Sequence, residues 1–341
     1  MRVAVDAMGG DYAPAAVVEG AVLAARSFPE LQITLVGRAP DIEAQLKRLS
    51  ASDCSVDIHH ATQVIGMDEP SRSALRDKTD SSITQAIRLA KEGKVNAVMS
   101  AGNTAAMVAA ATVLLGRLPG IRRPGLAACF PTRAGKPCLV IDVGANIGTE
   151  PSDLLDYAEM ASIFLQVVRG VEKPAIGLMN IGEEAVKGNK LAKETQRLME
   201  AAALNYRGNA EGSDVFRGEL DIIVCDGFVG NVMLKGAEGL ADFIKETLRS
   251  ALTRTWWLKL GAALCKPGFR ELHARLDTAE YGGAPLLGVD GNVVKTHGSS
   301  GPRAICLGIK RAFDLARERV NERIVAQVAE LAALKAGGQD A

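Results

Sequence analysis

The sequence predicts an α/β protein with a doubly wound, mostly parallel sheet in three layers. Two observations carry this prediction. Short β-branched runs recur along the chain, and each is followed by a Gly, Asn or Asp turn and then by a helical pattern. The runs are apolar without a break, which is typical of strands that are buried on both faces. Strand, turn and helix repeated in this order indicate a doubly wound fold.

The predicted elements follow one another from the N-terminus. The strand-and-turn runs are RVAVDAMGGD, ITLVGR, NAVMSAGNT, CLVIDVGAN, AIGLMNIGEE and DIIVCDGFVGN. The helices are expected over residues 15–26, over 41–49, up to 115, from about 152, over 189–203 and from 232 onward. Thr104 and Ser152 are candidate N-caps, since a hydroxyl can accept a hydrogen bond from a free N–H of the first turn. No Pro/Ser-rich linker divides residues 1–335, which are expected to form one catalytic domain, or two lobes around a cleft, before a frayed tail at 336–341.

The turns that follow the strands predict a ligand of phosphate type. In such sheets ligands bind at the carboxyl ends of the strands, above the helix N-termini. Glycine lets a ligand approach the backbone closely, and the free N–H groups of a helix start favour anions. Gly and Asn also simply form tight turns, but their repetition at the strand ends favours anion binding.

The bulk composition limits the classes of partner. Lys plus Arg and Asp plus Glu both number 40, so no global field gathers nucleic acid. The six cysteines form no CxxC pair, which favours reduced thiols in a cytosolic protein. The N-terminus has no signal-peptide pattern, and the longest apolar stretch, residues 105–115, is too short to span a bilayer. A soluble cytoplasmic protein is therefore expected.

Several common catalytic motifs are missing from the sequence. It contains no GxGxxG after the first strand, no GxxxxGK(S/T) and no GxSxG. Its four histidines form no HExxH or Cys/His cluster, so neither a metal nor another cofactor is expected. The chemistry that remains acts on bound anions through amides, lysines and a histidine.

Six blocks of the sequence resemble one known family. They are DAMGGD (6–11), SAGNT (100–104), DVGAN (142–146), NIGEEAVKGN (180–189), DGFVGNVMLK (226–235) and EYGGAPLLGVDGNVVKTHGSS (280–300). Together, in this order, they resemble the bacterial PlsX-type phosphate acyltransferases, from Met1 to about Arg323. One departure is Ala105, where the family pattern has Gly; its methyl group is expected to affect local packing and not activity.

The resemblance implies a reaction, a fold and partners. The reaction is acyl-[acyl carrier protein] plus phosphate giving acyl phosphate plus free carrier protein, early in bacterial phospholipid synthesis. The implied fold is like that of isocitrate and isopropylmalate dehydrogenases, in a homodimer. The membrane glycerol-3-phosphate acyltransferase, which uses the product, is a further candidate partner.

This reaction needs a phosphate cradle, a donor for a tetrahedral oxyanion and a proton acceptor. His297 is the candidate acid/base or oxyanion donor, with Lys187 and Asn231 as its catalytic companions. Asp6 is expected to orient its turn, as is Asp11. The candidate phosphate- and substrate-binding residues are Gly9, Gly10, Asp11, Gly102, Asn103, Thr104, Asn146, Asn180, Gly182, Lys235, Gly298, Ser299 and Ser300. A loop histidine bonded to backbone, and lysines on solvated helix faces, are the alternative interpretation.

An amphipathic segment at residues 240–276 differs from the rest of the chain. Residues 249–270 hold five basic residues, both tryptophans and no acid. This composition is typical of a helix on an anionic membrane surface, and it also suits an acidic carrier protein. A helix that packs in the dimer is the third interpretation. The candidate docking residues are Arg254, Trp256, Trp257, Leu258, Lys259 and Lys266.

Three other functions are compatible with parts of the sequence. They are a phosphotransacetylase that uses acyl-CoA, an oxidative decarboxylase of the isopropylmalate type, and a non-catalytic acyl-binding module. The decarboxylase would need a metal-binding aspartate cluster, which the sequence does not contain. Phosphate-dependent consumption of an acyl-carrier-protein thioester separates all of them.

Overall fold

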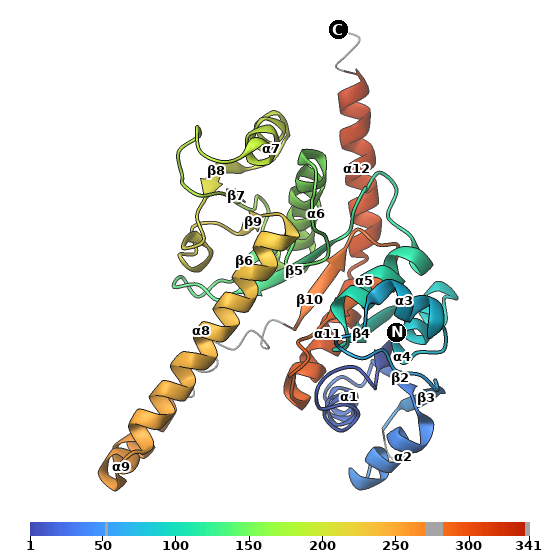
Figure 1. Cartoon of the computed structure of the whole chain (residues 1–341). Helices are drawn as coiled ribbons and strands as arrows, with labels where there is room; N and C mark the ends of the chain where they lie inside the picture. Colours follow the sequence, from blue (N-terminus) through green and yellow to red (C-terminus); the bar gives the residue numbers. More distant parts are fainter. Residues whose placement is uncertain (52–53, 270–281, 338–341) are drawn as a thin grey trace.

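The computed structural model describes residues 1–51, 54–269 and 282–337, and its centre is a sheet of eleven strands (Figure 1). The strands are β1 (Arg2–Asp6), β2 (Gln32–Gly37), β3 (Val56–His60), β4 (Ala97–Ser100), β5 (Gly125–Phe130), β6 (Cys138–Ile141), β7 (Ile176–Met179), β8 (Tyr206–Ala210), β9 (Ile222–Val224), β10 (Ala284–Leu287) and β11 (Asn292–Lys295). Their order across the sheet is β3-β2-β1-β4-β11-β10-β5-β6-β9-β7-β8.

The sheet contains two parallel sets of strands. The first set is β3, β2, β1, β4 and β11, which pair in parallel. The second set is β6, β9, β7 and β8, which also pair in parallel. Strands β10 and β5 pair antiparallel with each other and with their outer neighbours, and so join the two sets. The strand ends that could hold a ligand therefore fall into two groups.

Helices cover both faces of this sheet. They are α1 (Ala15–Ser27), α2 (Ala39–Arg48), α3 (Ser71–Asp77), α4 (Ser82–Lys91), α5 (Thr104–Ala110), α6 (Pro151–Arg169), α7 (Lys190–Ala201), α8 (Gly227–Thr253), α9 (Trp256–Leu264), α11 (Pro302–Arg317) and α12 (Val320–Gly337), with a π-helical turn over Ala111–Leu115 after α5. Each predicted helix is present within a few residues of its expected bounds.

Two separate apolar cores show that the fold has three layers. Val3 and Val5 belong to one core, together with residues of α1, α6 and α11. Ala4, between them on the same strand, belongs to the other core, with residues of α4 and α5. Successive strand residues point to opposite faces, so each face of the sheet has its own core. The predicted three-layer α/β class is confirmed.

The helix caps differ from the prediction because carboxylates and an asparagine take these positions. Asn103, and not Thr104, caps α5, since its side chain accepts a hydrogen bond from the N–H of Ala106. Helix α6 starts with a capping box between Glu150 and Asp153, so the assignment of Ser152 was also wrong. Asp226 accepts from the N–H of Phe228 and starts α8 at Gly227, five residues before the predicted start at 232.

Helices α8 and α9 form an arm that leaves the body of the molecule. In Figure 1, α8 runs away from the sheet and α9 lies at its far end. The predicted amphipathic segment 240–276 is thus two helices with a break at Arg254 and Thr255, described as far as Phe269; residues 270–276 lie outside the described residues. At the C-terminus, α12 spans Val320–Gly337. Residues 338–341 are likewise outside the description. Within the described parts of the chain, no helix combines the length and the apolar character required to cross a membrane.

Candidate functional site

The ends of β1, β4 and β11 meet in what we call the first turn cluster. A Cβ on Gly9 would lie 2.6 Å from the backbone N of Gly102, so the two turns touch through their backbones and glycine is required there. Gly10 lies beside Gly298, whose carbonyl accepts a hydrogen bond from the N–H of Asp11 (2.8 Å). Three blocks that are far apart in the sequence therefore form one surface.

Asp6 holds this cluster together. Its buried carboxylate accepts hydrogen bonds from Ser100 Oγ (2.7 Å) and from the N–H of Met8 (3.3 Å). Burial raises the pKa of Asp6, and the hydrogen bonds work against that rise. Asp6 thus orients the turn, in the way its position after the first strand suggested.

Lys295, at the end of β11, is the functional candidate that sequence reasoning missed. Only 7% of this lysine is exposed, and its Nζ donates to the carbonyl oxygens of Ala101 (3.2 Å) and Thr296. Burial lowers the pKa of Lys295 to about 8, against the attraction of nearby carboxylates that include Asp6. Lysine is almost never buried without a reason. Its place directly after the buried valines Val293 and Val294 was the available signal.

His297 lies next to this lysine and faces α8. The N–H of Ser299 donates to its Nδ1 (3.1 Å), which places the proton of the neutral ring on Nε2. Nε2 lies 3.5 Å from Glu238 Oε2, and 54% of the side chain remains exposed. The Ser299 hydroxyl is also 2.7 Å from Nδ1, and the N–H of Ser300 donates to the carbonyl of His297 (3.1 Å). The ring therefore offers an oriented N–H donor.

The ends of β6, β7 and β9 form the second turn cluster, built on Asp142. Its fully buried carboxylate accepts from the N–H groups of Leu126, Gly144, Ala145 and Asn146, at 2.8–3.0 Å. Burial raises the pKa of Asp142, and these bonds counteract the rise. The N–H groups predicted to cradle phosphate in this turn are thus already bound to the protein's own carboxylate.

The side chain of Asn146 is engaged in the same network. Its amide nitrogen lies 2.5 Å from the carbonyl O of Pro124, 2.9 Å from Tyr157 Oη and 3.1 Å from Asp142 Oδ2. A hydrogen bond from this amide nitrogen to a substrate would therefore require one of these bonds to break.

The NIG loop, residues 180–189, closes on itself beside this cluster. Asn180 accepts from the N–H of Ile181 (2.8 Å) and donates to the carbonyl of Lys187 (3.3 Å). Gly182 is buried against Glu184 and Lys187, while the Lys187 side chain is exposed. This loop therefore presents Lys187 to the outside.

Helix α8 links the two clusters along one face. Asn231 packs against Gly144 of the second cluster, and Glu238 reaches His297 of the first. Lys235 lies between them on the same face, at the spacing i, i+4, i+7, over roughly 10 Å of helix. Lys235 is exposed, and it is close enough to Lys295 to influence the charge of that amine. The structure thus places Asn231 and Lys235 on the face of α8 whose Glu238 reaches His297.

Asn103, the residue after Gly102 of the first turn cluster, fixes a neighbouring loop. The Asn103 amide donates to the carbonyls of Gly66, Met67 and Glu69, at 2.9–3.1 Å, which fixes that loop. Thr104 is the partly exposed first residue of α5. Ala105 is exposed, so its methyl group does not crowd the core. Over the described ranges, no group of three or more His, Cys, Asp or Glu side chains is arranged to hold a metal ion.

A family model described as "Fatty acid synthesis protein" matches residues 1–323 of this chain. The chain belongs to this family. It is 47% identical over 331 residues to the phosphate acyltransferase of Heliobacterium modesticaldum, covering 97% of each chain. It is 45% identical over 324 residues to the phosphate acyltransferase of Geobacter sulfurreducens, covering 95% of this chain and 93% of that one.

Solved structures with the same fold are phosphotransacylases. A phosphotransacetylase from Streptococcus pyogenes superposes with a TM-score of 0.63 at 17% identity, covering 93% of this chain and 94% of that one. A branched-chain phosphotransacylase from Enterococcus faecalis gives a TM-score of 0.55 at 16% identity, covering 93% and 99%. At sequence identities this low, the similarity shows only that the folds are alike.

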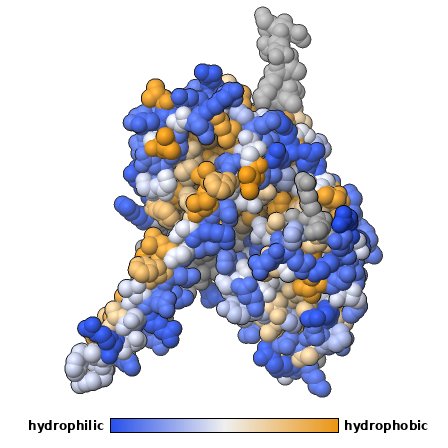
Figure 2. Space-filling model, in the orientation of Figure 1, coloured by the Kyte–Doolittle hydropathy of each residue, from blue (hydrophilic) through white to orange (hydrophobic). Residues whose placement is uncertain are grey.

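The candidate docking residues of this family member lie at the end of the arm. Arg254 follows α8, and the rings of Trp256 and Trp257 meet edge to face at 5.3 Å between centroids. Lys259 and Lys266 are exposed, whereas Leu258 is half-buried. With 70% of Trp256 exposed, the end of the arm presents aromatic and basic side chains together, and in Figure 2 this end is coloured from pale to blue, as residues of intermediate and high polarity.

Proposed function

We propose that this protein transfers an acyl group from acyl carrier protein to inorganic phosphate, at an early step of phospholipid synthesis. The observation that carries the proposal is the buried amine of Lys295 beside the touching glycine turns of β1 and β4. A buried cation next to backbone turns suits a phosphate dianion. The proposal also fits a family whose relatives are named phosphate acyltransferases.

The reaction then needs no covalent intermediate on the enzyme. Lys295 and Lys235 hold hydrogen phosphate, and one of its oxygens attacks the thioester carbonyl carbon. The oxyanion forms beside the Nε2–H of His297, which stabilises it. The carbon–sulfur bond breaks, and the departing thiol takes up the proton that the hydrogen phosphate loses. Asn231, Asn180 and Lys187 are proposed to contact the thioester.

A comparison of two donors tests this function. Purified protein is incubated with an acyl-carrier-protein thioester or with the matching acyl-CoA, with and without phosphate, and acyl phosphate is measured. Preferred, phosphate-dependent turnover of the carrier-protein thioester is expected. Equal or better use of acyl-CoA would identify a phosphotransacetylase, and the absence of acyl phosphate with both donors would reject the function.

We also propose that the protein works as a homodimer at the cytoplasmic face of the membrane. The continuous sheet favours one catalytic unit formed by both strand sets. The exposed Phe243 and Ile244 on α8 favour a partner for the arm, and the Trp–Lys end favours anionic lipid. Light scattering of the purified chain tests the dimer, because a monomer mass would reject it.

The membrane contact has its own test in the arm. Trp257→Glu combined with Leu258→Glu should release the protein from anionic vesicles, because both changes place charge at the headgroup boundary. Binding of the wild type should weaken as salt rises, since each basic residue contributes about 1 kcal/mol near such a surface. Co-sedimentation with vesicles measures both effects, with the exposed Leu23→Glu on α1 as the matched control. Equal sedimentation of all three proteins would leave the arm as a surface for the carrier protein or the dimer.

A further inference from the structure

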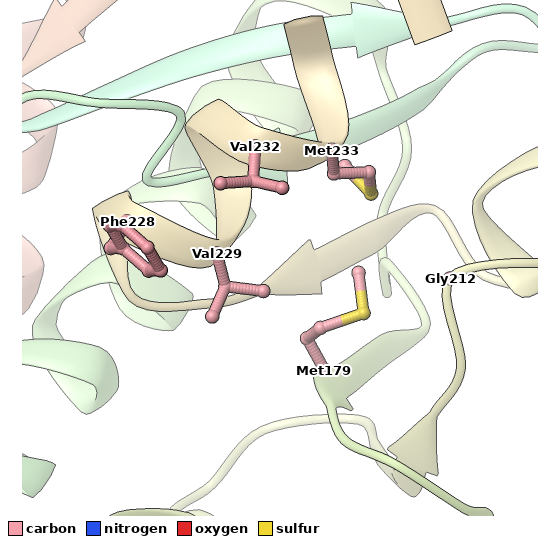
Figure 3. Close-up of a pocket in the computed structure, with 6 residues that line it drawn as sticks. All are labelled: Met179, Gly212, Phe228, Val229, Val232 and Met233. Carbon is pink, nitrogen blue, oxygen red and sulfur yellow. The ribbon is translucent and has the colours of Figure 1, made fainter. Parts of the chain in front are cut away.

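A pocket lined by apolar side chains lies at the start of α8, on a different side of the helix from the second turn cluster. Its volume is about 270 Å³, and it is lined by Met179, Gly212, Phe228, Val229, Val232 and Met233 (Figure 3). In Figure 3 the side chains of Val229 and Met233 on α8 lie toward Met179 at the end of β7. With 59% of Phe228 exposed, an aromatic ring stands at this pocket without being covered by the core. Apolar surface of this kind marks a binding site more often than chance.

The pocket contains free space beside Gly212, where a larger side chain would have filled it. Gly212 follows β8 and lines the pocket, yet a Cβ added there would meet no atom within 4 Å. The neighbouring NIG loop exposes two further large apolar residues, Ile181 and Val186. These residues extend the apolar surface beyond the pocket.

The pocket adjoins the polar residues of the candidate site. Asn180 directly follows the pocket residue Met179, and Asn231 directly precedes the pocket residue Val232. On α8, Gly230 packs so closely on the carbonyl of Asp142 that a Cβ would overlap it. One side of the first two helical turns therefore faces the second turn cluster, and another side faces the pocket. A molecule with a polar end and an apolar tail matches this arrangement.

We propose that this pocket binds the acyl chain of the thioester and sets the chain-length preference. This inference rests on the proposed function, because it assigns the tail of that substrate. Each methylene that leaves water in the pocket strengthens binding about fourfold. Met179 and Met233 suit chains of different length, since methionine side chains adapt their shape. The thioester then lies along the face of α8 that carries Asn231, with its carbonyl toward His297.

Two variants that fill the pocket test the proposal. Val232→Trp adds a large ring at an exposed position, and Gly212→Leu adds a side chain into open space, so the fold should tolerate both. The measurement is kcat/KM for acyl phosphate formation from butanoyl, octanoyl and hexadecanoyl carrier-protein thioesters. Both variants should lower the ratio of hexadecanoyl to butanoyl kcat/KM by about tenfold or more, as expected for a few methylenes kept in water.

The matched control is Val113→Trp, which places the same ring on an exposed valine in the π-helical turn after α5. Its chain-length ratio should equal that of the wild type. Ratios unchanged within about twofold in both pocket variants would overturn the proposal. A change of oligomeric state in Val232→Trp with an unchanged ratio would also overturn it, and would make the pocket an interface between copies.

A binding measurement separates this inference from the proposed function. Hexadecyl phosphonate and butyl phosphonate are titrated into each protein by calorimetry, without turnover. The wild type should bind hexadecyl phosphonate more tightly than butyl phosphonate, and Val232→Trp should abolish this difference. That result would support the pocket even if no acyl phosphate is formed. Equal binding of the two probes by the wild type would overturn the pocket while leaving the transferase reaction intact.

Discussion

The two turn clusters start from the same local design and differ in what fills them. Each contains a buried aspartate at the end of a strand, Asp6 in the first and Asp142 in the second. In the first cluster the carboxylate of Asp6 accepts from one backbone N–H, that of Met8, and from the hydroxyls of Ser100 and Ser82, and a buried amine, Lys295, lies beside it. In the second, the carboxylate of Asp142 accepts from four backbone N–H groups.

This difference favours the first cluster, and not the second, as the proposed anion site. The carboxylate of Asp142 occupies the position in which a phosphate would bind the N–H groups of DVGAN. The first cluster instead combines close backbone turns with the positive charge of Lys295 and the N–H of His297. In the first cluster the N–H groups of Met8 and Gly102 are likewise bound, by Asp6 and Ser100, so the positive charge of Lys295 is the feature that favours an anion there.

The largest effect is expected from Lys295→Met, which keeps the length of the side chain and removes the charge. The rate should fall about a hundred- to a thousandfold, as when one donor to a developing anion is lost. Steady-state kinetics at several phosphate concentrations measure the fall. A variant within about threefold of the wild type would move the phosphate site away from the first cluster.

The lowered pKa of Lys295 predicts that phosphate binding at the first turn cluster depends on pH. In the fold this pKa is lowered from 10.5 to about 8, so the phosphate affinity of the wild type should decrease above pH 8, and that decrease should be absent in Lys295→Met. The charged amine also opposes folding below pH 8, and the penalty disappears as the pH rises toward 10.5. The wild type should therefore gain stability relative to the variant between these pH values. Parallel urea unfolding of both proteins checks the sign.

His297→Gln should lower the rate of the folded enzyme by about 10²–10⁴ if the ring donates to the oxyanion or transfers a proton. Glu238→Gln, which changes only the partner of Nε2, should have a smaller effect. Turnover and thermal unfolding are measured on the same preparations. A histidine that only orders its loop would instead reduce the unfolding temperature and leave turnover nearly intact.

The two exposed lysines, Lys235 and Lys187, should each affect the KM of a different substrate. Lys235→Ala, on the face of α8 near Lys295, should raise the KM for phosphate about ten- to a hundredfold, as for a lost charge-assisted contact. Lys187→Ala, on the NIG loop, should raise mainly the KM for the thioester, by about fivefold or less for so exposed a charge. An equal rise in the phosphate KM of both variants would indicate that phosphate binds between the two turn clusters. It would weaken the assignment of phosphate to the first cluster alone.

The smallest effect on catalysis is expected from Asn146→Ala in the second cluster. This change leaves the Tyr157 hydroxyl and the Pro124 carbonyl without the amide, which should cost about 1–3 kcal/mol of unfolding free energy. The KM for phosphate should remain that of the wild type. An increased phosphate KM with unchanged stability would show that Asn146 meets the substrate and would break the comparison.

The sequence by itself determined the three-layer class, the family and, in their correct order, six of the eleven strands with the helices that follow them; β3, β5, β8, β10 and β11 were not predicted. These features are local, since apolar runs, turn residues and helical periodicity lie within short stretches, and the six blocks that carry the resemblance are contiguous. Even the helix starts were found within a few residues, and the misassigned N-caps were replaced by neighbours that compete for the same N–H groups.

Only the tertiary structure decided which of the predicted turns lies beside a buried cation. Asp6, Ser100 and Lys295 are about a hundred or more residues apart, and their contact depends on the parallel pairing of β1, β4 and β11. Burial of Lys295, which makes it a candidate, is a property of that pairing and has no periodicity to reveal it. The closure of DVGAN by Asp142, and the line from Asn231 to Glu238 that joins the clusters, likewise depend on how the strand ends pack against α8.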